Sequence, residues 1–126
     1  MKDEKKPSID LCVRTKSFAL RVIRLYSALP KSTLAQTLGK QVLRSGTSVG
    51  ANYREAHRSR SKNEFIAKIG DCLKELDETA YWLDLLVETG ILRLSKTKEL
   101  CGECDELLAI LTTISKKSKA SLLHHS

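Results

Sequence analysis

Apolar residues between Phe65 and Val87 recur with the period of an α-helix, and this long stripe limits the possible folds more than any other feature of the chain. A period near 3.6 puts the stripe on one helical face, whereas a strand requires alternation every second residue. Ser61 and Glu64 precede the stripe in the order of a capping box, and Gly90 follows it as a stop signal. The stripe consists of Phe65, Ile69, Cys72 or Leu73, Leu76, Ala80, Leu83 and Val87. The sequence therefore predicts a long helix between Ser61 and Gly90.

Three further segments carry stripes of the same period, over about residues 8–29, 32–58 and 95–119. Their expected N-terminal caps are Ser8, Ser32 or Thr33, and Ser95. Pro30 stops the first segment. The expected core residues are Leu11, Phe18, Val22, Leu25 and Leu29 in the first segment, Leu38, Val42, Val49 and Ala56 in the second, and Leu100, Cys104, Leu107, Leu111 and Ile114 in the last.

The connections between these segments are short, which favours antiparallel neighbours. We therefore predict an all-α fold, an antiparallel up-down-up-down four-helix bundle. The 126 residues are 41% hydrophobic and 5% aromatic, which suits one helical domain with its own core. We assign residues 1–7 to a charged N-terminal tail, 8–119 to the bundle domain and 120–126 to a C-terminal tail.

The sequence also bears on the compartment. No apolar run approaches the roughly 20 residues of a membrane span. The charged start Met1–Lys6 leads into no apolar signal region. We therefore expect a cytoplasmic protein with no membrane partner.

Four cysteines invite a metal or redox interpretation, which their context disfavours. They are Cys12, Cys72, Cys101 and Cys104. Cys101 and Cys104 have redox spacing, but that chemistry normally occupies a helix N-terminus in a βαβ setting. A zinc site needs two more ligands at a suitable spacing, which the histidines do not supply. The histidines are His57, His124 and His125. Cys104 falls on a core stripe, so we expect structural cysteines and no metal site.

Catalytic patterns are also missing. No glutamate precedes a histidine by three residues, as it does in di-iron bundles. Gly46 and Gly50 lie within a predicted helix, and no Gly-Lys-Ser or Gly-Lys-Thr follows them, so they form no phosphate-binding loop. We predict a non-enzyme without a cofactor.

Positive charge is concentrated in the first half of the chain, whose total net charge is +7 with a pI near 9.4. Residues 1–62 hold 14 Lys/Arg against 4 Asp/Glu, and residues 63–126 hold 8 against 11, so the halves carry +10 and −3. Seven cations of the first two helices lie away from the core stripes: Lys40, Arg44, Arg54, Arg58, Arg14, Arg21 and Arg24. A basic surface of this kind can contact the phosphates of RNA or DNA, so we predict a non-catalytic nucleic-acid-binding protein.

Other interpretations of the basic surface stay open. It can be a solvated face that keeps the protein soluble. It can also steer assembly toward the acidic side of another subunit at Asp71, Glu75 and Glu78. A protein–protein adaptor or assembly scaffold is therefore the alternative function.

Two features indicate more buried surface than a monomer needs. Gly46 and Gly50 lie one helical turn apart and each costs roughly 1 kcal/mol relative to alanine, so a close contact should offset them. The end of the helix that precedes Gly90 is apolar nearly all round, because its stripe is joined by Tyr81, Trp82, Leu85 and Leu86. Such a surplus favours self-association, and packing within one subunit is the alternative.

The block Gln41–Ala56, with the sequence QVLRSGTSVGANYREA, is the most distinctive stretch. It resembles the four-helix bundle proteins that are encoded in intervening sequences of bacterial 23S ribosomal RNA genes and labelled S23 ribosomal proteins. The other matching residues are Leu29-Pro30-Lys31, Phe65-Ile66, Lys74-Glu75 and Glu78-Thr79-Ala80-Tyr81-Trp82-Leu83. The resemblance covers about Phe18 to Leu94.

This resemblance implies an antiparallel bundle that assembles as a homopentameric barrel. It also implies a relation to the accessory variability proteins of diversity-generating retroelements, whose basic surface binds nucleic acid and a reverse transcriptase. The expected partners are therefore further copies of the chain, RNA or DNA, and, by distant analogy, a reverse transcriptase. We assign subunit contact or helix packing to Gly46, Gly50, Asn52, Tyr53, Glu55, Tyr81 and Trp82.

Overall fold

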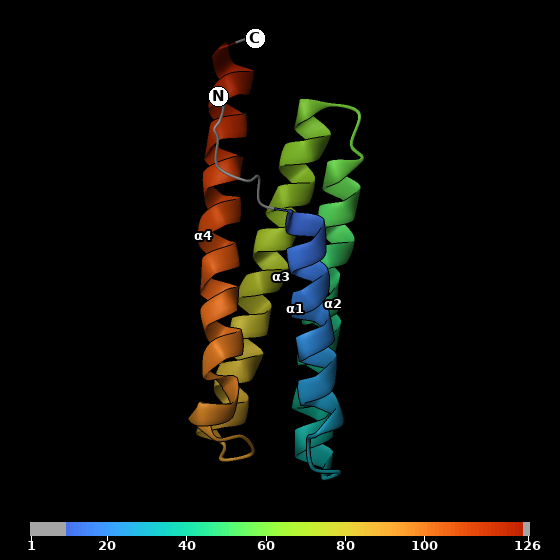
Figure 1. Cartoon of the computed structure of the whole chain (residues 1–126), viewed down its shortest axis with the longest axis vertical. Helices are drawn as coiled ribbons and strands as arrows, with labels where there is room; N and C mark the ends of the chain where they lie inside the picture. Colours follow the sequence, from blue (N-terminus) through green and yellow to red (C-terminus); the bar gives the residue numbers. More distant parts are fainter. Residues whose placement is uncertain (1–9, 125–126) are drawn as a thin grey trace.

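The computed structural model describes residues 10–124, and every regular element within them is an α-helix (Figure 1). The helices are α1 (Leu11–Ser27), α2 (Thr33–His57), α3 (Lys62–Glu88) and α4 (Leu94–His124). Each helix packs along the next one in the chain, so the predicted up-down-up-down four-helix bundle is confirmed. The first and last helices, α1 and α4, contact each other only sparsely, and the bundle is least closed along that side.

Most of the helices begin and end at the local signals that the sequence predicts. Ser32 caps α2 by accepting a hydrogen bond from the Ala35 amide, and Ser61 caps α3 by accepting one from the Glu64 amide. Gly90 has a φ of +80°, and the amide of Ile91 donates to the carbonyl of Leu86 at 3.0 Å. This Schellman arrangement satisfies carbonyls at the end of α3 that would otherwise lack partners.

Three predicted boundaries are wrong. Asp10 caps α1 by accepting from the Val13 amide, and the proposed cap Ser8 lies outside the described residues. Ser95 lies inside α4, which begins at Leu94. The helix also continues to His124, through most of the segment assigned to a tail. Lys, Ala and Leu favour helix there, and Lys62 Nζ donates to Ser121 Oγ at 2.9 Å, which joins this end of α4 to α3.

The core stripes are largely those predicted, with changes on α3. Cys72 is fully buried and Leu73 only partly, and Leu86, which the sequence places away from the stripe, is also fully buried. The reason is that α3 packs against both α2 and α4, so it buries a wider arc than one stripe. A buried hydroxyl pair, Ser45 and Thr79 at 2.8 Å, joins α2 to α3. No helix in residues 10–124 combines the length and apolarity needed to cross a membrane.

The conspicuous glycines of α2 face α1 of the same chain. A Cβ added at Gly46 would lie 2.7 Å from Val22 Cγ2, and one at Gly50 would lie 3.3 Å from Thr15 Oγ1. Such distances mean that the two helices are close because these positions lack side chains. The structure therefore uses Gly46 and Gly50 for packing within one subunit.

Candidate nucleic-acid interface

Arg14, one of the seven predicted phosphate-binding cations, is held in an ion pair between α1 and α4. Its Nε lies 2.7 Å from Glu103 Oε2 and its Nη2 lies 2.9 Å from Glu103 Oε1, while Nη2 also lies 2.5 Å from Glu106 Oε1. The two-pronged bond from Arg14 lowers the pKa of Glu103, and the same bonds raise the pKa of the guanidinium. Arg14 thus links the two helices that otherwise contact least.

Arg44 makes a similar link between α2 and α3. Its guanidinium donates to Glu78 and, from Nη1, to Glu75 Oε1 at 3.2 Å. These carboxylates, Glu78 foremost, raise the pKa of Arg44. Two of the three acidic residues that the sequence offers to another subunit, Glu75 and Glu78, are therefore already paired within the chain with Arg44.

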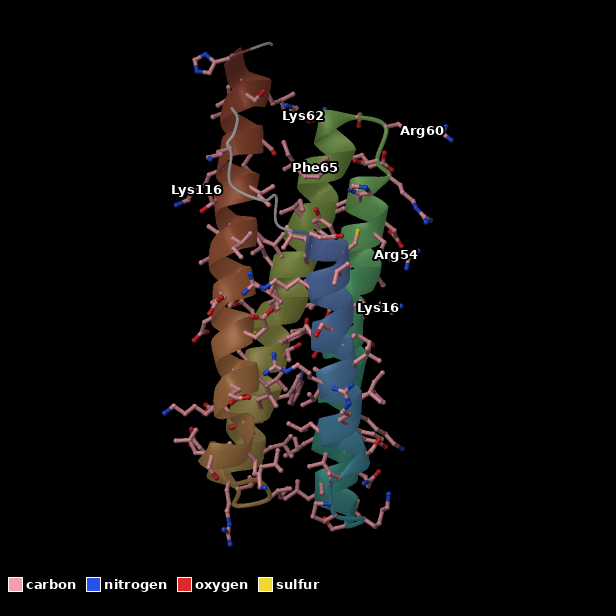
Figure 2. The ribbon with its side chains drawn as sticks, viewed as in Figure 1. Lys16, Arg54, Arg60, Lys62, Phe65 and Lys116 are labelled. Atoms are coloured by element: carbon pink, nitrogen blue, oxygen red, sulfur yellow. The ribbon has the colours of Figure 1, made fainter. Side chains whose placement is uncertain are left out.

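Four other cations form what we call the cationic edge, which consists of Lys16, Arg54, Arg58 and Arg60. All four are exposed, and within residues 10–124 none of them forms an ion pair. Figure 2 shows Lys16, Arg54 and Arg60 projecting to the same side of the molecule, with Lys116 of α4 projecting to the opposite side. Arg58 lies with Lys16 and Arg54 around a shallow hollow between α1 and α2.

The close packing of α1 on α2 produces this arrangement. A second hollow, lined by Thr15, Lys16, Gly50 and Arg54 among others, adjoins the first. Because Gly50 lets Thr15 approach, Lys16 comes beside Arg54 one turn further along α2. The sequence did not single out Lys16 or Arg60, since only the helix pairing and the loop after α2 bring them to this edge.

The remaining predicted cations lie elsewhere. Lys40 is exposed nearer the start of α2. Arg21 and Arg24 line a groove between α1 and α4, on a different flank of α1 from Lys16. The structure therefore brings together two of the seven predicted cations, Arg54 and Arg58, and adds two others.

The residues assigned to packing or subunit contact occupy mixed environments. Asn52 and Tyr53 are partly buried, and burial raises the pKa of the Tyr53 hydroxyl. Glu55 is exposed and pairs with Lys68 of α3 at 2.6 Å. Tyr81 is 57% exposed and meets the Trp82 ring edge-on at 5.1 Å between centroids. Trp82 Nε1 is buried, and no residue in the range 10–124 accepts a hydrogen bond from it.

The cysteines are free, and two belong to the core as predicted for Cys104. Burial raises the pKa of both Cys72 and Cys104 to about 12. The Sγ of Cys72 donates to the Val49 carbonyl at 3.5 Å, and that of Cys104 to the Leu76 carbonyl at 3.4 Å. Burial likewise raises the pKa of Cys101. The described part of the chain contains no cluster of three or more His, Cys, Asp or Glu side chains that could hold a metal ion.

Comparison with known proteins agrees with the architecture. The protein-family profile described as 23S rRNA-intervening sequence protein matches residues 8–113. The chain is also similar to a crystal structure of a protein of unknown function from the S23 ribosomal protein family of Bacteroides thetaiotaomicron. That protein is 36% identical, superposes with a TM-score of 0.80, and the match covers 85% of this chain and 99% of the other. No curated protein matches the chain. The sequence resemblance noted above is thus confirmed, and the chain belongs to the 23S rRNA-intervening sequence protein family.

Proposed function

We propose that this protein is a non-catalytic, oligomeric helical bundle of the cytoplasm that binds RNA or DNA through its cationic edge. The observation that supports this function most directly is the set of four exposed cations without ion pairs, within residues 10–124, on one side of the molecule. Phosphate contacts of this kind release counterions, so they supply affinity without base-specific recognition. The close α1–α2 contact around Gly50 would hold Lys16 beside Arg54.

The proposal differs in its residues from the one made on sequence alone. Arg14 and Arg44 already have carboxylate partners, and a phosphate would have to displace them. Lys16, Arg54, Arg58 and Arg60 have no such competitor in the described part of the chain. We therefore assign phosphate contacts to the cationic edge and structural roles to Arg14 and Arg44.

The test is binding by nuclease-treated protein over a salt series, with 23S rRNA fragments, generic RNA and duplex DNA as ligands. The family description mentions 23S rRNA, which makes its fragments the first ligand to try. The variant Lys16→Gln/Arg54→Gln/Arg58→Gln should bind more weakly. Its log-log salt slope should also be shallower by about 0.7 to 0.9 for each phosphate that the variant no longer neutralises.

A matched control removes the same number of charges from α4. Lys98→Gln/Lys116→Gln/Lys117→Gln changes three exposed lysines and leaves the cationic edge intact. It should retain the wild-type slope. Equal weakening in both triple variants would mean that only net charge matters, and that result would overturn the assignment to the cationic edge.

A protein–protein adaptor or assembly scaffold is the second candidate. It is supported by an apolar hollow between α3 and α4, where Tyr81 and Leu94 are 57% and 64% exposed beside Val87 and Cys101. Further copies of the chain, as in a homopentamer, or by distant analogy a reverse transcriptase would be the partners. Failure of any nucleic acid to bind at low salt, together with a stable protein partner recovered after nuclease treatment, would favour this function.

A further inference from the structure

The side of the bundle where α1 and α4 contact least contains a groove that the proposed function does not use. It lies between the C-terminal half of α1 and the first turns of α4, with the α3–α4 connection at one end, and its volume is about 450 Å³. That volume is within the range of about 300 to 1,000 Å³ typical of small-molecule sites. Its lining residues are Arg21, Arg24, Leu25, Ala28, Leu92, Lys96, Glu99 and Leu100.

The groove combines an apolar lining with an excess of positive charge. Leu25, Leu92 and Leu100 contribute aliphatic surface from three segments of the chain. The lining contains three cations and one carboxylate. The cations are Arg21 and Arg24 from α1 and Lys96 from α4, and the carboxylate is Glu99. None of these four charged residues forms an ion pair within residues 10–124. The lining of the groove therefore has a net positive charge. A further carboxylate, that of Glu103, interacts with Arg21 at longer range and is itself paired with Arg14.

This combination differs from the cationic edge. Nucleic-acid backbones are strongly hydrated anions and gain little from aliphatic side chains, whereas an amphiphile gains from removing its own apolar surface from water. Charge complementarity selects an anion over a cation or a neutral molecule. The occupant that fits both features has an aliphatic portion and an anionic end.

The size of the groove distinguishes a small molecule from a partner helix. The wall from Arg21 to Ala28 is about 10 Å long at a rise of about 1.5 Å per residue. A helix of average length, about 11 residues or 16 Å, would extend past this wall. A medium-chain alkyl group fits within it, so the length of the groove favours a small amphiphile over a helix.

We propose that this groove binds a medium-chain aliphatic carboxylate, with the alkyl chain on Leu25, Leu92 and Leu100 and the carboxylate between Arg21, Arg24 and Lys96. Guanidinium groups suit this end because they donate two parallel hydrogen bonds to a carboxylate. Binding needs no covalent step and does not depend on the nucleic-acid function.

Decanoate is the probe, at a concentration below that at which it forms micelles, with binding followed by calorimetry and by methyl NMR. Decyltrimethylammonium has the same chain and the opposite charge, and butyrate has the same charge and a short chain. We expect decanoate to bind at least tenfold more tightly than either. We also expect its largest methyl shifts at Leu25, Leu92 and Leu100.

Two variants test the residue assignment. Arg21→Gln/Arg24→Gln should weaken decanoate binding at least tenfold while the circular dichroism spectrum is unchanged, since Arg24 is exposed and Arg21 only partly buried. Lys16→Gln/Arg54→Gln, which removes the same charge from the cationic edge, should bind decanoate normally. Nucleic-acid binding should be weakened by Lys16→Gln/Arg54→Gln and unaffected by Arg21→Gln/Arg24→Gln. Failure of one proposal can therefore be distinguished from failure of the other.

Several outcomes would overturn the proposal. Equal binding of decanoate and decyltrimethylammonium would show nonspecific apolar association. Equal weakening in both double variants would show a general charge effect. No decanoate binding by the wild type would exclude the site, and if Arg21→Gln/Arg24→Gln then also lowered the sedimentation mass, a second copy of the chain would be the occupant.

Discussion

At the scale of single residues, positions without a side chain are as informative as positions with a reactive one. Gly46 and Gly70 are both interior to helices, but only Gly46 has a neighbour where a Cβ would stand. The same residue type therefore has opposite energetic consequences at the two positions.

We expect Gly46→Ala to destabilise the fold by about 1 to 2 kcal/mol, because the overlap with Val22 outweighs the gain in helix propensity. Gly70→Ala, where a Cβ meets no described residue within 4 Å, should stabilise it by about 0.5 to 1 kcal/mol. Urea unfolding of both variants measures the difference. Equal effects of the two substitutions would contradict the close α1–α2 approach.

The cysteines permit a second prediction at this scale. Because the pKa of Cys72 and Cys104 is about 12, roughly one thiol in ten thousand is ionised at pH 8, and only the thiolate is nucleophilic. Ellman's reagent should therefore modify at most Cys12 and Cys101 in native protein at that pH. All four thiols should react after denaturation in guanidinium. Rapid reaction of all four in the native protein would disprove the burial of Cys72 and Cys104.

At the scale of helices, the bundle is held unevenly. The α1–α2 and α2–α3 pairs have continuous interfaces, while α1 and α4 depend on fewer contacts, of which the ion pair of Arg14 with Glu103 is the clearest. Because Glu103 titrates, the contribution of this ion pair to the free energy of unfolding should depend on pH.

We expect Arg14→Gln to cost about 1 kcal/mol at pH 7, in the range of partly exposed ion pairs. The folded pKa of Glu103 lies below its ordinary value of 4.5, so the unfolded chain binds more protons at this residue in acid. The contribution is thus complete above about pH 5 and is lost as the pH falls through the folded pKa. In urea unfolding, the wild type and Arg14→Gln should therefore differ in stability at pH 7, and the difference should shrink as the pH falls through the folded pKa of Glu103.

The double variant Arg14→Gln/Glu103→Gln provides the control for that prediction. Its cycle with the two single variants isolates the coupling between the partners. A coupling energy indistinguishable from zero at pH 7 would mean that the Arg14–Glu103 pair does not help to hold α1 against α4.

At the scale of the whole molecule, the exposed apolar surface bears on assembly. Tyr81 and Leu94 flank a hollow on one side of the bundle, away from the α2 glycines that the monomer already covers. If the proposed homopentamer forms through this surface, polar substitutions there will separate the subunits.

We expect sedimentation equilibrium to give a mass of about five times 14.1 kDa for the wild type and a shift toward 14.1 kDa for Tyr81→Ser/Leu94→Ser. Leu20→Ser/Ile23→Ser, which changes two exposed apolar residues of α1, should leave the mass unchanged. A monomeric wild type would remove the pentamer from the proposed function.

The sequence by itself determined the helices, because their signals are local. The apolar period, Ser32, Ser61 and Gly90 act within a few residues and predict both the elements and their order. Errors occurred where two local caps competed, as at Asp10 against Ser8, and at the end of α4, where contact with Lys62 accompanies a longer helix.

Only the tertiary structure decided which cations lack a carboxylate partner among the described residues and so remain available to contact phosphates. Arg14 and Glu103 are 89 positions apart and Arg44 and Glu78 are 34 apart, so no periodicity along the chain reveals that they are paired. Lys16 likewise reaches Arg54 only because Gly50 lets α1 approach α2. Charge composition is a property of the sequence, but the free charge on a surface depends on contacts between distant residues.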